Sequence, residues 1–330
     1  MRVATWNLWW RFGPWEERQP AIRAALADID ADVVLLQEVF GPTADHHDQA
    51  EDLADHLGMH WVATTNHTSQ TSFGSHTGRT SFGSDTSRTS FGSDTSRTSF
   101  GSDTSRTSFG SDTSRTSFGN AILSRWPVLD ADQRNLPDRS GRPAHRTGLW
   151  ALLDHPDGPQ PVATTHLEWR YDDSRLRQAQ LDDLVHWLDQ HHRGLGALLD
   201  APPDEHRPLI FGGDLNATPD SDEVRRLVGL APGYSDHGDA VRVFTDAWAA
   251  CGDGDGFTWT RDNPHSSDAQ WPRRRLDYLF TSWPRPKPTG NPVACWVAGS
   301  EPVDGVVASD HACVVAEFDD RPPFDEHRTS

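Results

Sequence analysis

The sequence lacks several features that would assign it to a common functional class. Its three cysteines, Cys251, Cys295 and Cys313, are scattered without paired spacing, which favours reduced thiols over a disulfide framework or a zinc site. No apolar run approaches the roughly 20 residues that span a bilayer. The first residues lead directly into an expected strand without a charged and then apolar leader. We therefore expect a cytoplasmic protein with no transmembrane segment.

Positive charge is also scarce. The chain has 30 Lys and Arg against 49 Asp and Glu, a formal net charge of -19. This balance disfavours an extended electrostatic surface for binding a nucleic acid backbone. A local basic patch at the entrance to a site on an otherwise acidic protein is compatible with it. The 330 residues, with 35% hydrophobic content, 14 Trp and 14 Phe, are enough for a folded protein with a substantial core.

The most informative motif lies in residues 209–220. Leu209, Ile210 and Phe211 predict a buried strand, and a glycine pair then opens a turn that carries Asp214 and Asn216. These two residues are two apart and point the same way from extended backbone. A carboxylate can polarise a water or hold a divalent cation, and the amide can donate to an oxygen. The pair suits attack on a phosphate ester, although an ordinary turn with an Asx cap has the same pattern.

Three other expected strands end on polar residues. The strand within residues 3–8 ends at Asn7, the strand 32–39 includes Glu38, and the strand 161–167 reaches His166. A carboxylate at the end of a buried strand is costly without a cation or hydrogen bonds, so Glu38 is either a metal-ligand candidate or a surface residue. His166 is either structural or a group that protonates a leaving oxygen.

The carboxyl-terminal third adds basic and acidic candidates. The run Arg273–Arg275 is either a phosphate clamp or a solvated loop edge. The strand that follows begins at Asp277, and Asp310 and His311 stand in a tight turn before the last strand. A carboxylate against an imidazole fixes its tautomer, so Asp277 or Asp310 beside His311 is a plausible acid/base pair.

A nine-residue repeat interrupts this pattern. Phenylalanines recur every nine residues from Phe73 to Phe118 on the unit Ser-Asp-Thr-Ser-Arg-Thr-Ser-Phe-Gly. One aromatic in nine otherwise polar residues cannot build a core. Excision of residues 75–119, five units of nine, joins Gly74 to Asn120 and leaves an uninterrupted sequence that leads into an expected strand. We expect a disordered loop insertion rather than a calcium-binding solenoid, which requires a second glycine and an apolar residue in each unit.

Six motifs in a fixed order resemble the endonuclease/exonuclease/phosphatase superfamily, which includes deoxyribonucleases, abasic-site endonucleases, neutral sphingomyelinases and inositol polyphosphate 5-phosphatases. The motifs are Thr5-Trp6-Asn7, Gln37-Glu38-Val39, Thr165-His166-Leu167, Gly213-Asp214-Leu215-Asn216, Leu276-Asp277-Tyr278 and Ser309-Asp310-His311. The resemblance runs from Met1 to about Phe318 and is interrupted only by the repeat.

The resemblance implies an α+β fold. We expect a four-layer αββα sandwich in which two mixed, mainly antiparallel sheets pack face to face with helices outside. Residues 1–330 then form a single domain, with the repeat 75–119 as an inserted loop and 319–330 as a flexible tail. The repeat lies in a loop that in relatives helps shape the substrate mouth.

The resemblance also implies roles for individual residues. The metal side of the pocket comprises Glu38, Asn7 and Asp310, and the ion is Mg²⁺, with Mn²⁺ equally suited by hardness. The catalytic groups are Asp214, which orients or deprotonates the attacking water, Asn216, which donates to the phosphate, His166 near the leaving group, and His311 oriented by Asp277. Arg146 and Arg275 are predicted to bind the substrate.

We therefore predict a Mg²⁺-dependent phosphoesterase that cleaves a phosphodiester bond by activated-water attack, with nucleic acid as a candidate substrate and no obligate protein partner. Two alternatives stay open. In the first alternative, the substrate is a phospholipid headgroup or a small phosphomonoester, and the net charge of -19 is compatible with such a substrate. In the second, the domain is a noncatalytic binding module that uses the repeat as its interaction arm.

Overall fold

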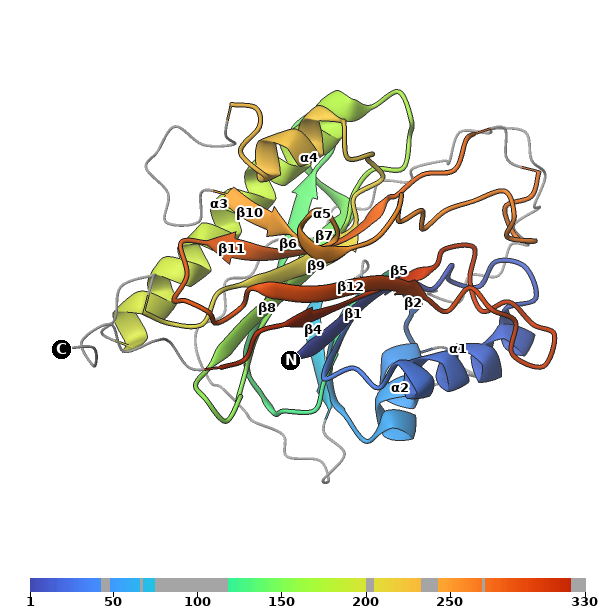
Figure 1. The fold of residues 1–330 in the computed structure, drawn as a ribbon, viewed down its shortest axis with the longest axis horizontal. Helices are drawn as coiled ribbons and strands as arrows, with labels where there is room; N and C mark the ends of the chain where they lie inside the picture. Colours follow the sequence, from blue (N-terminus) through green and yellow to red (C-terminus); the bar gives the residue numbers. More distant parts are fainter. Residues whose placement is uncertain are drawn as a thin grey trace.

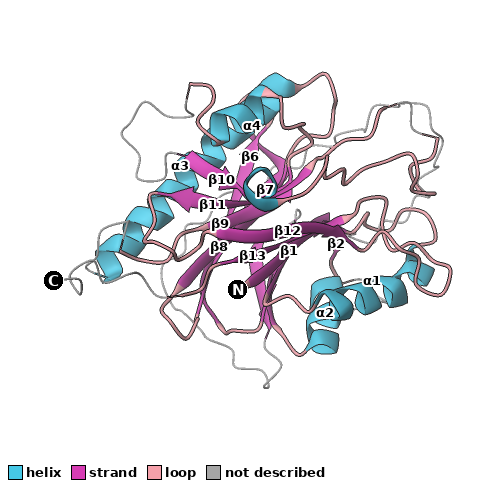
Figure 2. Cartoon of the chain, viewed as in Figure 1, coloured by secondary structure: helices cyan, strands magenta, loops and turns pink. Residues whose placement is uncertain are grey.

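The structure has four layers, in which two β-sheets pack face to face and helices cover their outer faces (Figures 1 and 2). This computed structural model describes residues 1–42, 48–65, 68–74, 118–199, 205–232, 243–268 and 271–321. The predicted four-layer αββα architecture is confirmed. No helix among the described residues is long and apolar enough to cross a membrane.

The first sheet has seven strands. In spatial order they are β12 (Pro292–Ala298), β13 (Cys313–Phe318), β1 (Arg2–Asn7), β2 (Val33–Phe40), β5 (Phe118–Ser124), β3 (His60–Thr65) and β4 (Thr68–Gly74). Only β1 and β2 are parallel neighbours; the other neighbours are antiparallel. Helices α1 (Trp15–Ile29) and α2 (Gln49–Leu57) cover its outer face (Figure 1).

The second sheet has six strands. In spatial order they are β10 (Val243–Asp246), β11 (Asp277–Trp283), β9 (Ile210–Asp214), β8 (Gln160–His166), β7 (Pro143–Leu153) and β6 (Val128–Pro137). Its one parallel pair is β8 and β9. Helices α3 (Ser174–Leu199) and α4 (Asp222–Leu227) cover its outer face, and the short α5 (Ala247–Cys251) follows β10 and packs against β11 and β12.

Three hydrophobic cores separate the four layers. On β1, the side chain of Val3 enters the core between the sheets, whereas Ala4 and Trp6 enter the core beneath α1 and α2. This alternation follows the two-residue period of a strand. Phe211 on β9 belongs to the third core, beneath α3 and α4. Because both faces of the central strands are buried, their sequences are nearly continuous apolar runs, and their polar residues stand at strand ends.

The repeat connects β4 to β5. Residues 75–117 lie outside the described part of the chain, as do residues 322–330, so the predicted disordered insertion and flexible tail remain predictions. The two strands lie on opposite sides of β3, which separates them in the sheet. The last repeat unit contributes Phe118 and Gly119 to β5, and Thr71–Gly74 at the end of β4 has the same sequence, Thr-Ser-Phe-Gly, as residues 116–119.

Candidate active site

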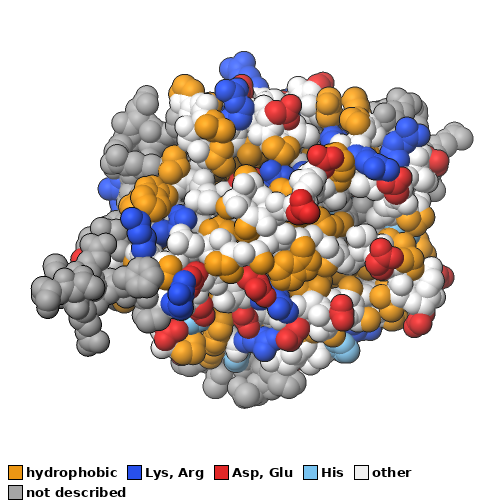
Figure 3. Space-filling model, viewed as in Figure 1, with side chains coloured by type: hydrophobic (Ala, Val, Ile, Leu, Met, Phe, Trp, Pro, Cys, Tyr) orange, Lys and Arg blue, Asp and Glu red, His pale blue; other side chains and the backbone are white. Residues whose placement is uncertain are grey.

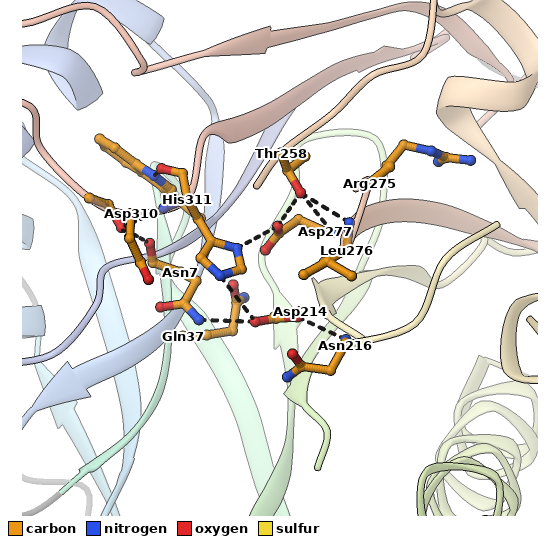
Figure 4. A network of polar contacts seen from close by, with 12 residues as sticks. Asn7, Gln37, Asp214, Asn216, Thr258, Arg275, Leu276, Asp277, Asp310 and His311 are labelled. Atoms are coloured by element: carbon orange, nitrogen blue, oxygen red, sulfur yellow. Dashed lines mark hydrogen bonds and ion pairs between the residues drawn. The ribbon is translucent and has the colours of Figure 1, made fainter. Parts of the chain in front are cut away.

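The polar strand ends of both sheets meet at one edge of the sandwich. Parallel pairing places Asn7 of β1 beside Gln37 of β2, and His166 of β8 beside Asp214 of β9. Antiparallel pairing places Asp277, the first residue of β11, opposite Asp214. Parallel neighbours run toward the same edge of a sheet, and Figure 4 shows Asn7 and Gln37 of the first sheet close to Asp214 and Asp277 of the second.

The turn after β9 is shaped by Gly213 and Asn216. Gly213 has φ +148°, and a Cβ there would lie 2.0 Å from the carbonyl oxygen of Thr165, so no other residue fits without a backbone shift. Asp214 Oδ1 accepts a hydrogen bond from the Asn216 backbone N–H at 2.8 Å, which is the Asx-type turn. Asn216 itself has a left-handed backbone, with φ 48°. The turn therefore fixes the direction of the Asp214 carboxylate.

A bulge in β2 aims the Glu38 side chain. The pairing of β2 with β5 shifts register between Leu36 and Val39, and Glu38 has φ 55°. A bulge of this kind redirects one side chain out of the alternating pattern. The neighbouring Gln37 is fully buried, and its Nε2 lies 3.1 Å from Thr5 Oγ1 of the first sheet and 2.8 Å from Thr164 Oγ1 of the second. Gln37 thus joins the two sheets directly beneath the site.

Arg18 of α1 holds the loop after β1. Trp9 and Trp10 both have positive φ, 56° and 35°, a conformation that costs of order 1–3 kcal/mol for each residue other than glycine. The buried Arg18 guanidinium compensates by donating to several backbone carbonyls. These acceptors are those of Leu8, Trp9, Trp10, Phe12 and Ala308, at 2.8–3.1 Å. Burial lowers the pKa of Arg18 to about 10, against the opposing charges of Asp310 and Glu38, so the side chain remains a cation at neutral pH.

His311 is held by Asp277 and Thr258 (Figure 4). Its Nδ1 lies 2.8 Å from Asp277 Oδ2, and the Thr258 hydroxyl donates to the same carboxylate oxygen at 2.5 Å. Burial alone would lower the pKa of His311, but the charges of Asp277, Asp214 and Asp310 raise it well above its ordinary value. The ring is therefore an imidazolium at neutral pH. Its Nε2 faces Asp214 Oδ2 at 3.8 Å, too far for a hydrogen bond, so both atoms are available to a third group.

Asp214 is the most connected carboxylate of the site. Its Oδ2 accepts from Asn7 Nδ2 at 3.0 Å and lies 3.5 Å from His166 Nε2. Burial and the charge of Asp277 raise the pKa of Asp214 to about 6, against the charge of His311 and the hydrogen bonds from Asn216 and Asn7. A buried carboxylate with this pKa is mostly ionised at pH 7 and is well matched to accept a proton there.

His166 and Asn216 form a pair. Asn216 Nδ2 lies 3.1 Å from His166 Nε2 and 3.2 Å from the Leu167 carbonyl oxygen. Since the amide donates to the carbonyl, we assign Nε2 of His166 as its second acceptor, which leaves the ring hydrogen on Nδ1. Burial, together with the charges of Arg146 and His311, lowers the pKa of His166 well below its ordinary value, so the ring is neutral. Both amide hydrogens of Asn216 are thus engaged within the protein.

Glu38 and Asp310 fit the metal side of the pocket. Glu38 Oε2 is buried without a hydrogen-bond partner among the described residues. Burial and the charge of Asp310 raise the pKa of Glu38 to about 7, and burial raises that of Asp310 as well. An all-oxygen donor set of this kind suits a hard divalent ion. Asn7 Oδ1 already accepts from the Trp9 N–H at 2.9 Å and keeps one lone pair for the same ion.

The two predicted substrate-binding arginines have different surroundings. Arg146 Nη1 is buried without a partner among the described residues, and burial lowers the pKa of its guanidinium against the charges of Glu168, Glu38 and Asp214. A buried cation with an unused nitrogen beside the carboxylates suits an anionic substrate. Arg275 instead forms a buried bidentate pair with Asp246, at 3.0 and 2.8 Å, and points away from His311 (Figure 4). The prediction that Arg275 binds the substrate is therefore corrected to a structural ion pair.

The structure adds residues that the motifs did not single out. Phe118 of the last repeat unit lies beside the site, its ring centre 6.2 Å from those of His166 and Trp10. Arg18 and Gln37 support the site from beneath. A signal existed for Arg18, because it precedes Ala21 and Ile22 by three and four residues and so shares their buried helix face. Phe118 carries no such signal, since it is one of six equivalent phenylalanines in the repeat.

A family model for the endonuclease/exonuclease/phosphatase family matches residues 4–311. No curated protein matches the sequence significantly.

Several solved structures share the fold. The human Nocturnin catalytic domain with bound sulfate anion is 17% identical, with 97% of this chain and 94% of that chain covered and a TM-score of 0.59. D. rerio TDP2 complexed with single strand DNA product is 19% identical, with 97% and 98% covered and a TM-score of 0.60. An endonuclease/exonuclease/phosphatase from Beutenbergia cavernae DSM 12333 is 22% identical, with 96% and 70% covered and a TM-score of 0.54.

Proposed function

Since the chain belongs to the endonuclease/exonuclease/phosphatase family and is a metal-dependent hydrolase of phosphate esters, we propose that it uses Mg²⁺ to cleave phosphodiester bonds of nucleic acid. The observation that carries this proposal is the facing pair of Asp214 Oδ2 and His311 Nε2, 3.8 Å apart. One is a carboxylate poised to accept a proton, and the other is a cation poised to donate one. The noncatalytic alternative has no support from this arrangement.

Asp214 acts on the attacking water. With its Oδ1 held by the Asn216 backbone N–H and its Oδ2 by Asn7, the carboxylate cannot rotate freely. It orients the water toward the phosphorus atom and accepts its proton as the new bond forms. Its pKa of about 6 is close to neutral pH, where a general base is most effective when its pKa lies near the pH of the reaction.

His311 and His166 act on the phosphate oxygens. The imidazolium of His311, oriented by Asp277 at 2.8 Å, donates its Nε2 proton to the oxygen of the leaving group as the bond between that oxygen and phosphorus breaks. Neutral His166 is oriented by Asn216, which is engaged at 3.1 Å, and presents its Nδ1–H toward the Glu38 side of the pocket. In this arrangement Asn216 positions His166 and does not itself donate to the phosphate. Arg146 attracts the anionic substrate.

Glu38, Asp310 and Asn7 are the residues that would hold the divalent ion. When bound, Mg²⁺ neutralises charge on the phosphate and lowers the pKa of water, so no covalent enzyme intermediate is required. Mn²⁺ has the same preference for oxygen ligands, and we propose Mg²⁺ first with Mn²⁺ as a substitute.

Two observations bear on the substrate. The D. rerio TDP2 structure holds a single strand DNA product, which supports nucleic acid. The face shown in Figure 3 carries acidic and basic side chains interspersed, without a basic stripe, and the net charge is -19. A nucleic acid substrate would therefore be held by local contacts near the pocket and not by an extended electrostatic surface.

A substrate panel tests the proposal. Single-stranded DNA, abasic duplex, sphingomyelin vesicles and bis-p-nitrophenyl phosphate are assayed with EDTA and after return of Mg²⁺ or Mn²⁺. We expect metal-dependent cleavage of DNA, and a loss of about 10²- to 10⁴-fold in kcat/KM for Asp214→Asn. Asp222→Asn, at an exposed carboxylate on α4, is the matched control. Faster turnover of sphingomyelin than DNA would replace nucleic acid by a phospholipid substrate, and activity of Asp214→Asn within a few fold of wild type would refute the site.

We also propose that the protein acts in the cytoplasm. Its three cysteines are all unpaired, and Cys295 and Cys313 are buried, which suits a reducing compartment.

A further inference from the structure

Exposed aromatic side chains gather on loops beside the pocket. Trp169, Tyr171 and Trp271 are 59%, 52% and 44% exposed. The rings of Tyr171 and Trp271 are stacked, with centroids 4.1 Å apart and an interplanar angle of 17°. Among the described residues, the other large aromatic side chain with comparable exposure is Trp283, at the far end of β11. Concentration of exposed aromatics in one place marks a binding surface more often than chance exposure does.

Arg274 fixes this pair of rings in place. Its guanidinium carbon lies 5.3 Å from the centre of the Tyr171 ring, 6.0 Å from that of Trp271 and 4.8 Å from that of Trp259. Such contacts are favourable cation–π interactions. Arg274 forms no ion pair with a carboxylate of the described residues, and its Nε is buried without a partner among them. The cation therefore has donors left for an anionic ligand.

Both loops that carry the stacked rings adjoin catalytic residues, since Tyr171 follows His166 at the end of β8 and Trp271 precedes Asp277 at the start of β11. Tyr171 lies five residues after His166 in the chain. The backbone of Trp259 forms bridges to Arg274 and to His311, so a single extended segment separates Arg274 from the segment that carries the catalytic imidazole. Because Arg274 contacts both stacked rings and is bridged through Trp259 to the segment of His311, the aromatic pair lies beside the catalytic site.

We propose that Tyr171 and Trp271, supported by Arg274, form a platform on which a base of single-stranded nucleic acid stacks while the adjoining phosphate occupies the pocket. This proposal rests on the proposed phosphodiesterase function and specifies its substrate class. Aromatic rings accept any base on their faces, and arginine adds a contact to the backbone. The bases of a duplex are stacked on one another and do not offer their faces, so the platform selects an unpaired nucleotide.

A lipid headgroup is a weaker match to the same surface. Membrane-binding surfaces combine aromatic with aliphatic side chains on one face. The exposed aliphatic residues Leu129, Leu199, Leu230 and Val293 belong to β6, α3, the segment after α4 and β12, and none stands on the two loops. The parallel stack of Tyr171 on Trp271 also presents ring faces and not separate apolar tips, which favours a flat ligand.

The test measures binding apart from catalysis. Fluorescence anisotropy in EDTA gives the Kd of a fluorescein-labelled oligothymidylate and of an oligomer of the same length made of base-free tetrahydrofuran phosphodiesters. We expect Trp271→Ala and Tyr171→Ala each to weaken oligothymidylate binding about 10- to 100-fold, with little change for the base-free oligomer. Trp271→Phe keeps a ring face and should recover most of the affinity. Trp283→Ala, at an equally exposed tryptophan (43%), is the control.

Each other result overturns the platform. These results are equal losses for the two oligomers, no loss for oligothymidylate, and no binding of oligothymidylate by the wild-type protein. A Trp271→Ala defect confined to hydrolysis of sphingomyelin vesicles would also overturn it and would assign the rings to a lipid surface. If oligothymidylate binds as expected but is not cleaved after Mg²⁺ is returned, the proposed function fails while the platform stands.

Discussion

At the residue scale, Arg18 shows how one buried side chain stabilises a loop that the backbone disfavours. Its guanidinium satisfies five carbonyl oxygens between Leu8 and Ala308. Lysine retains the charge but has a single nitrogen, so several of these acceptors would remain buried and unpaired. We expect Arg18→Lys to lower the free energy of unfolding by about 2–4 kcal/mol. We expect it to lower kcat as well, because the loop that it stabilises, with Trp9 and Trp10, directly follows Asn7 in the chain.

Urea denaturation and steady-state kinetics check this expectation. Arg23→Lys is the matched control, since Arg23 lies on the same helix and pairs with the partly exposed Asp52. The control should cost no more than about 1 kcal/mol. Equal effects of the two substitutions would show that the carbonyl contacts of Arg18 are unimportant.

His192 predicts a pH dependence of stability that is independent of catalysis. It lies on α3, 3% exposed, with its ring 4.5 Å from that of His206. Burial, together with the charge of the neighbouring His206, lowers the pKa of His192 to about 4. The unfolded chain binds a proton below about pH 6.5, whereas the folded protein does so only below about pH 4. This histidine's contribution to stability is therefore complete above pH 6.5 and falls by about 3 kcal/mol as the pH decreases to 4.

Urea denaturation of the wild type and His192→Leu at several pH values measures this effect. Other groups also titrate, so the informative quantity is the difference between the two proteins. That difference should change in favour of the variant as the medium becomes more acidic. A difference that is constant with pH would place the titration of His192 at its ordinary value.

At the element scale, the sequence predicted the strand ends but not every side chain direction. Asn7, Glu38, His166 and Asp214 could be found because each interrupts an apolar run, and two parallel pairs then bring the four strand ends together. The direction of Glu38 could not be predicted, since it depends on a bulge opposite β5, a partner separated by the repeat. The weakly apolar edge strand β6, with mostly exposed or half-buried residues, also carries little sequence signal.

The arginine run shows the same limit. Arg274 and Arg275 are adjacent, so extended backbone sends them to opposite sides. Arg274 lies against the aromatic rings beside the site, whereas Arg275 enters the interior to meet Asp246. Which of the two faces the pocket is determined by the bridge between Trp259 and Arg274, and no local pattern indicates that pairing.

The repeat leads to a prediction about β5. Deletion of residues 75–119 places Thr71–Gly74 immediately before Asn120, so that an identical Thr-Ser-Phe-Gly segment replaces residues 116–119. Gly74 then takes the position of Gly119, where a Cβ would lie 2.1 Å from the Thr64 carbonyl oxygen. Thr71–Gly74 then give up their pairing with β3, so the edge strand β4 is lost from the first sheet. We expect the variant to be less stable than wild type toward urea but to keep the wild-type kcat/KM to within about threefold, because Phe73 takes the place of Phe118 in the sequence before Asn120.

Deletion of residues 75–118 is the control. It removes one residue fewer and moves the phenylalanine out of register by one position, to the other face of the strand. Kinetic assays of both deletions should therefore differ, with the second losing the ring that packs against His166. Equal activity of the two variants would show that Phe118 and its register do not matter.

At the scale of the whole molecule, the buried carboxylates of Glu38 and Asp310 connect stability to the proposed divalent ion. A ligand that binds only the folded state stabilises it. At a Mg²⁺ concentration about ten times its Kd, the melting temperature should rise by about 2–4 °C relative to EDTA. Glu38→Gln removes a buried like charge, so we expect this variant to melt no lower than wild type in EDTA and to lose the Mg²⁺-dependent rise.

Differential scanning calorimetry of both proteins in both conditions checks this prediction. Asp30→Asn, at an exposed carboxylate that pairs with Arg125, should keep the wild-type response to Mg²⁺. An undiminished rise for Glu38→Gln would place the ion elsewhere in the molecule.

The repeat begins after Thr71–Gly74 and ends with residues 116–119, and the identical sequence of these two segments has a genetic consequence. Loss or gain of whole units by replication slippage preserves the reading frame and always leaves Thr-Ser-Phe-Gly adjacent to Asn120. Alleles that differ in the number of repeat units would therefore encode enzymes with the same Thr-Ser-Phe-Gly segment beside the site. Natural length variants should differ in chain mass while their turnover numbers stay similar.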